Sequence, residues 1–205
     1  MSGSTDIVSN SDIASFPPRG LFADLLGASF TRLGARIRDV HDGRSQCLQG
    51  TASVTRGRSL LARAICRLAS LPHVQTDGPV RVDLDVATDG ETWTRRFGDS
   101  APMRSVLRAC GGLLAEQLGP LQLRFRLREA GGNMEWLLES VRLLGIPAPR
   151  AWLQQTTARC TQREGRYCFE VNVTLPFVGH VVGYRGSVER RVVDAARGDL
   201  RESHG

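Results

Sequence analysis

The stretch Tyr167–Val188, which reads YCFEVNVTLPFVGHVVGYRGSV, decides the fold of this chain. Apolar residues alternate with polar ones on both sides of Pro176–Gly179, a pattern typical of two half-buried strands joined by a turn. With the bend at Phe177 and Val178, one register matches apolar residues on one face and opposite charges on the other. The stretch therefore predicts a long antiparallel hairpin with one buried face. Its predicted pairs are Phe169 with Gly186, Val171 with Tyr184, Val173 with Val182 and Glu170 with Arg185.

The same two-residue period recurs around two further turns. Val80–Val86 leads into Asp89 and Gly90, a strong hairpin signal, and Leu121–Leu127 leads into Gly131 and Gly132. Across the first turn the predicted pairs are Val86 with Trp93, Leu84 with Arg95 and Val82 with Phe97. Across the second they are Leu127 with Trp136, Phe125 with Leu138, Arg128 with Glu135 and Arg124 with Glu139. Further strands are predicted at Cys47–Thr55, Met103–Cys110, Leu113–Leu118 and Thr156–Gln162.

Helical periodicity is confined to the N-terminal part of the chain. It predicts one amphipathic helix over Leu21–Val40 and a second, capped by Ser59, over Ser59–Ala69. Long strands that are apolar on one face must curl around something. We therefore predict an α+β fold, with two N-terminal helices packed on a long, curved antiparallel β-meander, a partly closed, barrel-like sheet. We expect residues 1–18 to form a disordered arm, 19–190 a single domain, and 191–205 a flexible or frayed helical tail.

Composition narrows the possible functions. The 205-residue chain has a net charge of +6, but all 27 basic residues are arginine, and acidic residues are interspersed among them. We therefore expect no nucleic-acid partner, and the lack of lysine excludes Schiff-base and Walker-type chemistry. No apolar run approaches the roughly 20 residues that span a bilayer, and the N-terminus lacks a signal-peptide pattern. We expect a cytoplasmic protein without a membrane span.

The five cysteines include no Cys-x-x-Cys pair, which favours reduced thiols over a metal or redox site. Cys160 and Cys168 would face each other across a turn at Glu164 and Gly165 in one strand register, whereas a register changed by one residue would separate them. We expect neither a metal nor a cofactor.

Arg95 is the main candidate for a binding residue, because it falls on the apolar face of its strand. An arginine there must form an ion pair, for instance with Glu116, reach outward, or contact an anion or carbonyl in a cavity. Aromatic residues on the same predicted faces either line a pocket for a hydrophobic ligand or fill the core. The predicted ligand-binding set is Arg95, Trp93, Phe97, Trp136, Phe169 and Tyr184.

His41 and Asp42, at the end of the first predicted helix, are the weak catalytic candidates. A histidine held by a carboxylate is a common acid–base pair. The competing interpretation is a histidine at a helix terminus that bonds free carbonyl groups, which we favour because adjacent residues seldom point the same way.

The chain contains several spaced motifs: Phe30-x-x-Leu33, Val40-His41-Asp42, Trp93-Thr94-Arg95-Arg96-Phe97, Glu116-x-x-Gly119-Pro120, Gly131-Gly132, Leu144-Gly145-Ile146-Pro147-x-Pro149, Phe169-Glu170-Val171, Leu175-Pro176-x-x-Gly179 and Tyr184-x-Gly186. With them, the segment from about Leu21 to Glu189 resembles a bacterial domain family of unknown function that is often fused C-terminal to saccharopine-dehydrogenase-like Rossmann domains. The resemblance implies no established activity and no catalytic residues. Because this chain has no Gly-x-Gly-x-x-Gly motif, it implies at most an association in trans with a dehydrogenase-like protein.

Three functions remain open at this point. The leading hypothesis is a binding module that encloses a lipid-like or other small hydrophobic molecule, with Arg95 at its polar end. The second is an enzyme, a hydrolase or isomerase, that uses His41 and Asp42 together with Arg95. The third is a domain that docks on a dehydrogenase-like protein through an exposed apolar face. We expect a binding module rather than an enzyme.

Overall fold

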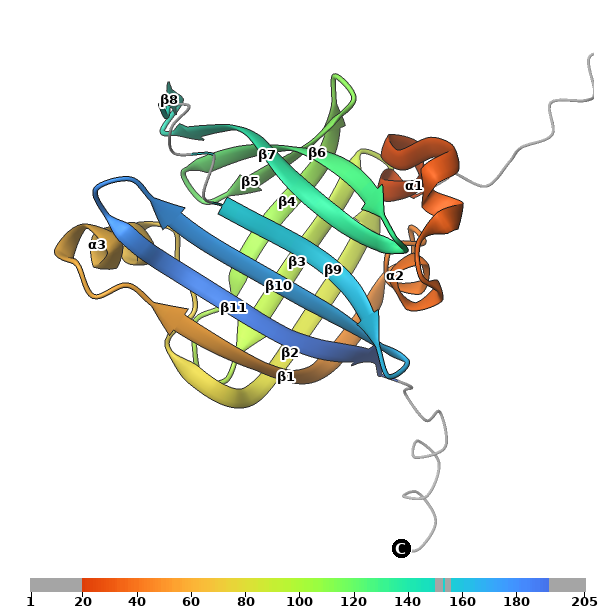
Figure 1. Cartoon of the computed structure of the whole chain (residues 1–205), viewed down its shortest axis with the longest axis horizontal. Helices are drawn as coiled ribbons and strands as arrows, with labels where there is room; N and C mark the ends of the chain where they lie inside the picture. Colours follow the sequence, from red (N-terminus) through yellow and green to blue (C-terminus); the bar gives the residue numbers. More distant parts are fainter. Residues whose placement is uncertain (1–19, 150–152, 154–155, 192–205) are drawn as a thin grey trace, which may run out of the picture.

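The computed structural model describes residues 20–149, 153 and 156–191 (Figure 1). Its helices are α1 (Leu21–Leu26), the 3-10 helix η1 (Gly27–Arg32), α2 (Ala35–Val40) and α3 (Leu60–Leu68). Its strands are β1 (Gln46–Arg56), β2 (Gln75–Ala87), β3 (Gly90–Phe97), β4 (Met103–Cys110), β5 (Leu113–Leu118), β6 (Leu121–Ala130), β7 (Asn133–Leu143), β8 (Ile146–Pro147), β9 (Thr156–Arg163), β10 (Arg166–Leu175) and β11 (Gly179–Arg190). The predicted arm 1–18 lies outside the described residues, as does the predicted tail beyond Arg191.

Ten of these strands form a closed antiparallel barrel. Each strand from β1 to β6 pairs with the next, β7 pairs with β9, β9 with β10, β10 with β11, and β11 with β1. The two-residue β8 pairs with the end of β7, outside the ring. The predicted α+β fold, with two helices packed on a partly closed sheet, is therefore wrong. The β1–β11 pairing closes the ring, and the helices are short segments at its two ends.

The predicted helix over Leu21–Val40 is also wrong as a single element. Gly27 adopts a φ of 54° and ends α1, after which the chain continues as η1 and, beyond Gly34, as α2. Glycine takes positive φ at little cost, so the chain changes direction there while the apolar spacing persists. These three segments cover one end of the barrel, here called the α1 end, and α3 lies at the opposite end, here called the α3 end (Figure 1).

The hairpin of β10 and β11 is confirmed in position and register. Val173 pairs with Val182, Val171 with Tyr184, Phe169 with Gly186 and Glu170 with Arg185, as predicted. The pairs of Leu127 with Trp136, Phe125 with Leu138 and Arg128 with Glu135 are confirmed in β6 and β7. These pairs were predictable because both faces of each hairpin favour the same register.

Two other register predictions are wrong. Ala87 pairs with Gly90, so Thr88 and Asp89 form the turn, and β3 is shifted by two residues from the prediction: Leu84 pairs with Trp93, Val82 with Arg95 and Val80 with Phe97. In β6 an irregularity after Arg124 pairs that residue with Ser140, and Glu139 instead bonds Arg126 at 2.8 Å. Cys160 pairs with Phe169, which separates it from Cys168.

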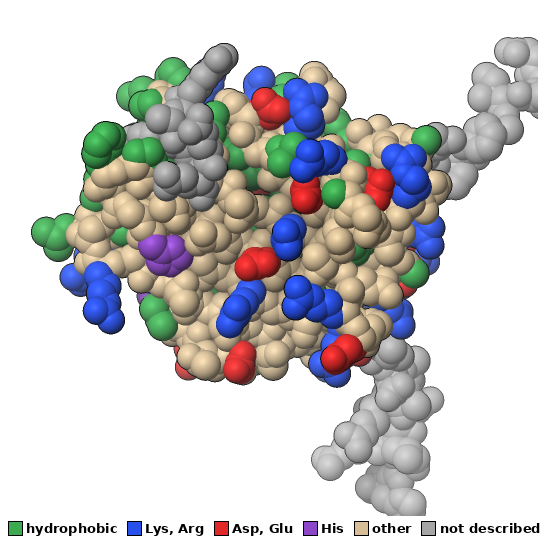
Figure 2. All heavy atoms as spheres, viewed as in Figure 1, with side chains coloured by type: hydrophobic (Ala, Val, Ile, Leu, Met, Phe, Trp, Pro, Cys, Tyr) green, Lys and Arg blue, Asp and Glu red, His purple; other side chains and the backbone are tan. Residues whose placement is uncertain are grey.

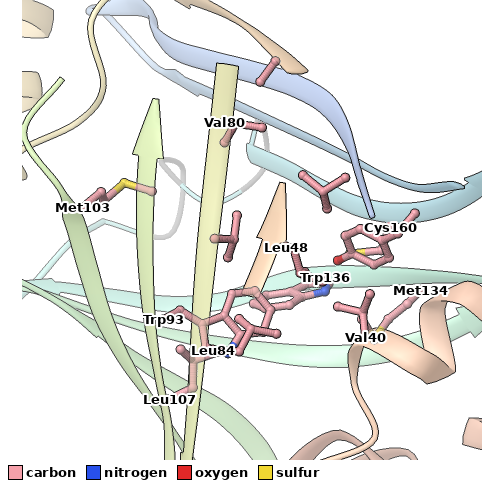
Figure 3. Packing of buried hydrophobic residues seen from close by; sticks show 14 of the residues in the cluster. Val40, Leu48, Val80, Leu84, Trp93, Met103, Leu107, Met134, Trp136 and Cys160 are labelled. Carbon is pink, nitrogen blue, oxygen red and sulfur yellow. The ribbon is translucent and has the colours of Figure 1, made fainter. Parts of the chain in front are cut away.

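The barrel has a charged outer wall and an apolar interior. Arginine and acidic side chains are mixed on the wall (Figure 2), as in the pairs Arg96–Asp83 and Arg128–Glu135. Inside, Trp93 and Trp136 lie against each other with ring centroids 6.0 Å apart, surrounded by aliphatic side chains (Figure 3). Two arginines of β6, Arg126 and Arg128, are thus matched by the carboxylates of Glu139 and Glu135 on β7.

Candidate functional site

The barrel encloses a cavity of about 330 Å³, which inward-facing residues of all ten strands line. Its wall is almost entirely aliphatic and aromatic. The volume exceeds the lower bound of roughly 300 Å³ for small-molecule sites. Leu61 and Leu68 of α3 line the cavity and are 55% and 51% exposed, so the cavity reaches the surface at the α3 end.

The structure places all six predicted ligand-binding residues on the cavity wall. Trp93, Phe97 and Trp136 are buried and also belong to the core, whereas Phe169 and Tyr184 are partly buried. The two interpretations of the aromatic set thus coincide, because the same rings fill the closed part of the barrel and border its cavity. Their role in binding a ligand stays a prediction.

Arg95 extends into the barrel and is held by partners on the two next strands. Its Nη1 donates to Ser105 Oγ at 2.9 Å, and Nη1 and Nη2 both lie 3.4 Å from Glu116 Oε1. Its guanidinium also lies 4.8 Å from the centre of the Trp93 ring. Of the interpretations left open for Arg95, the structure shows the ion pair with Glu116, and the pair forms one polar spot in an apolar wall.

Tyr184 borders the same cavity from β11. Burial raises the pKa of its phenol to about 12, which keeps the hydroxyl protonated at neutral pH. Within the described part of the chain this hydroxyl makes no hydrogen bond. It is therefore a neutral donor and acceptor beside the cavity.

His41 and Asp42 do not form an acid–base pair. His41 ends α2 and its side chain is buried, whereas Asp42 lies near the surface beside Arg44 and Arg190. Burial lowers the pKa of His41 from 6.5 to about 3, although the charge of Asp42 acts in the opposite direction. A histidine that stays neutral, away from the cavity wall, does not serve as a proton shuttle there.

His41 instead belongs to a buried polar chain that the sequence did not indicate. Tyr167 donates to Cys160 Sγ at 2.9 Å, and His41 Nε2 lies 3.1 Å from the same hydroxyl. Because the phenol has one proton, Nε2 is the donor in that second bond. Burial raises the pKa of Cys160 to about 11, so its thiol is protonated at neutral pH. The chain ties α2 to β9 and β10.

Glu91 is a buried carboxyl group that the sequence analysis missed. It is 4% exposed, its Oε2 accepts from Trp93 Nε1 at 2.8 Å, and its Oε1 has no partner in the described chain. Burial raises the pKa of Glu91. The sequence could have indicated this burial, because Glu91, Trp93 and Arg95 are spaced two residues apart and therefore lie on the same face of β3.

Other classes of site were also considered. The described residues contain no group of three or more side chains with metal-ligating chemistry, and all five cysteines are unpaired. None of the helices in the described ranges is long and apolar enough to cross a membrane.

The comparisons with known proteins agree with the domain resemblance. No curated protein matches this chain. Residues 33–188, which include most of the barrel, match the family described as domain of unknown function (DUF4166). The chain belongs to this DUF4166 family of domains of unknown function.

Proposed function

We propose that this domain is a binding module that holds a small, largely apolar molecule in the barrel interior. The observation that carries the proposal is the combination of an apolar cavity of about 330 Å³ with one buried polar spot, Arg95 and Glu116, on its wall. Binding sites for small molecules typically combine a hydrophobic wall with a few polar groups that fix orientation. The cavity also reaches the surface at the α3 end, which provides an entrance.

The charges on the wall favour a ligand with a neutral polar end. Arg95 already has a carboxylate partner, so a ligand carboxylate would place a second anion beside Glu116 with one cation to share. A hydroxyl, carbonyl or ester oxygen adds no charge. It can accept from a remaining N–H group of Arg95 or from Tyr184. The exposed Arg159 also borders the cavity, but its cross-strand neighbours are the carboxylates Glu135 and Glu170. Arg159 therefore does not favour an anionic ligand either.

A neutral fluorescent probe, N-phenyl-1-naphthylamine, tests whether the cavity binds apolar molecules. Ala158 faces the cavity and the next residue, Thr157, is exposed on the outer face of the same strand. Ala158→Trp fills the cavity and is expected to weaken probe binding about tenfold or more, the cost of a steric clash. Thr157→Trp is the matched control and should bind as the unmodified protein does.

Saturable probe binding that only Ala158→Trp disrupts supports the proposal. Absence of saturable binding, or equal binding by both variants, contradicts it. Native mass spectrometry of protein purified from its own host, with extraction of co-purifying small molecules, then identifies the natural ligand.

A dehydrogenase-like partner in trans is a separate proposal with a narrower basis. Its support is the family resemblance, and no contact between described residues bears on it. Enzyme activity through His41 and Asp42 is not proposed, because the two side chains lie apart and neither faces the cavity.

A further inference from the structure

Exposed apolar side chains gather at one end of the barrel. Of the eight large hydrophobic side chains exposed in the described residues, seven lie at the α3 end, and Leu137 on the outer wall is the exception. Figure 2 shows a cluster of hydrophobic side chains at the end where Figure 1 places α3 and β8. We call these seven residues the rim: Leu60, Leu61, Leu68, Val74, Leu144, Ile146 and Phe177.

Two rim residues occupy backbone positions that normally favour glycine. Phe177, at the tip of the β10–β11 turn, is fully exposed with a φ of 63°, and Leu144, in the β7–β8 turn, is 73% exposed with a φ of 52°. A bulky residue with positive φ is strained, and such strain is typical of functional positions. In the hairpin turns at the α1 end the positive-φ positions are held by the glycines Gly111, Gly131 and Gly165 and by the polar Glu164, not by large apolar residues. The requirements of the turns therefore do not explain why large apolar residues, Phe177 and Leu144, occupy these two positions.

The rim is also basic. Between Gly50 and Thr76 the sequence has four arginines and no acidic residue. Three of them, Arg58, Arg63 and Arg67, are exposed on or beside α3, and no ion pair joins them to another described residue. On the outer wall, by contrast, arginines such as Arg96 and Arg128 have carboxylate partners. At the same end Asp77 and Asp99 are also exposed, so the positive charge without an ion-pair partner is concentrated on and beside α3 rather than over the whole rim.

We propose that the rim docks the protein on the surface of an anionic phospholipid bilayer. Leucine and phenylalanine side chains that project separately from a helix and two turns suit insertion among lipid headgroups, and nearby arginines suit the phosphates. A protein partner would instead favour a continuous face that packs closely. The described chain starts at Gly20 and ends at Arg191, both at the α1 end, which leaves the rim at the opposite end.

Docking in this orientation turns the cavity entrance toward the lipid. Leu61 and Leu68 belong both to the rim and to the cavity wall. An apolar molecule would then pass between membrane and barrel without crossing water. Docking itself does not depend on the cavity being occupied, so it stands or fails separately from the proposed binding function.

Vesicle flotation of the full chain tests the proposal. We expect binding to phosphatidylcholine vesicles that contain phosphatidylglycerol, weaker binding to pure phosphatidylcholine, and loss of binding at high salt. Phe177→Asn with Leu144→Asn removes two apolar tips and suits positive φ, so it should fold and bind at least about tenfold more weakly. Leu137→Thr, which removes an exposed leucine from the outer wall, is the matched control and should bind normally.

The basic residues are tested in the same assay. Arg63→Gln with Arg67→Gln should weaken binding to the anionic vesicles, by roughly fivefold for each arginine. Arg163→Gln, at the α1 end, is the control and should have no effect. Phe177→Trp adds a direct readout, because brominated lipids should quench its fluorescence and should not quench a tryptophan placed at Leu137.

The proposal is overturned if the unmodified protein does not float with anionic vesicles, or if it floats equally well after both rim substitutions. A protein captured through the rim, without vesicle binding, would assign the surface to a protein partner and would also overturn it.

Discussion

Arg95 of β3 and Glu116 of β5 meet inside the barrel across the intervening strand β4, with Arg95 Nη2 3.4 Å from Glu116 Oε1. Their side chains are 11% and 9% exposed, so bulk water screens the pair little. Ser105 of β4 holds the guanidinium in place from between them. In such surroundings the loss of one partner costs more than the replacement of both, because a single buried charge is left without a counter-ion.

Arg95→Met is therefore expected to lower the free energy of unfolding by about 3–5 kcal/mol, since Glu116 then stays buried and unpaired. Arg95→Met combined with Glu116→Leu should recover most of that loss, to within about 2 kcal/mol of the unmodified protein. Chemical denaturation measures both. The control is Arg96→Met, whose exposed pair with Asp83 is worth less than about 1 kcal/mol. A double variant no more stable than Arg95→Met would show that the pair is not isolated from solvent.

The same double variant tests the polar end of the ligand. In the unmodified protein, decan-1-ol should displace N-phenyl-1-naphthylamine more effectively than decanoate, because Glu116 repels a second carboxylate. With both charges removed, the alcohol should lose affinity by roughly tenfold to a hundredfold, the worth of one hydrogen bond to a charged group. A preference of the unmodified protein for decanoate would contradict a neutral ligand without affecting the proposal that the cavity binds apolar molecules.

Much of the candidate site was predictable although part of the register was not. The β2–β3 pairing differs from the prediction by two residues, and a shift of two keeps every side chain on its original face. Arg95, Trp93 and Phe97 therefore point inward as predicted. The turn itself could not be located from Asp89 and Gly90, because Thr88 and Asp89 form an equally short loop.

The closure of the barrel was not predictable from local patterns. The β1–β11 seam joins residues such as Gly50 and Val188, which are far apart in the sequence. Hydrophobic alternation identifies a buried face but not the strand beside it. The breaks at Gly27 and Gly34 were missed for a related reason, since the apolar spacing continues through them. The different directions of His41 and Asp42 did follow from their adjacency, but which of the two points inward did not.

The depressed pKa of His41 predicts acid sensitivity. In the unfolded chain His41 takes up a proton near pH 6.5, whereas in the fold it stays neutral down to about pH 3. Between these values the unfolded state binds more protons, so stability falls as the pH is lowered, by up to about 1.4 kcal/mol per pH unit. His41→Phe keeps an aromatic ring beside Phe22 and Trp93 and should flatten this slope.

Denaturation curves of the unmodified protein and His41→Phe across this range provide the measurement. Their difference isolates His41, because Glu91, whose pKa is raised, titrates in both proteins and acts in the opposite direction. At neutral pH the variant should lose about 1–2 kcal/mol through the missing bond to Tyr167. Parallel slopes in the two proteins would show that His41 is protonated in the folded state.

Closure of the barrel has its own test at Gly50, in the seam between β1 and β11. A Cβ atom at Gly50 would lie 1.9 Å from the carbonyl oxygen of Ser187 in β11, so Gly50→Ala must push the two strands apart. We expect a loss of about 3 kcal/mol or more in the free energy of unfolding, at the upper end for a steric clash in a packed site. Gly111→Ala, in a turn with a φ of 60° and no atom within 4 Å, should cost only about 1 kcal/mol. Similar losses in the two variants would mean that β1 and β11 are not in contact, since a clash at Gly50 requires β11 beside it and strain at Gly111 does not.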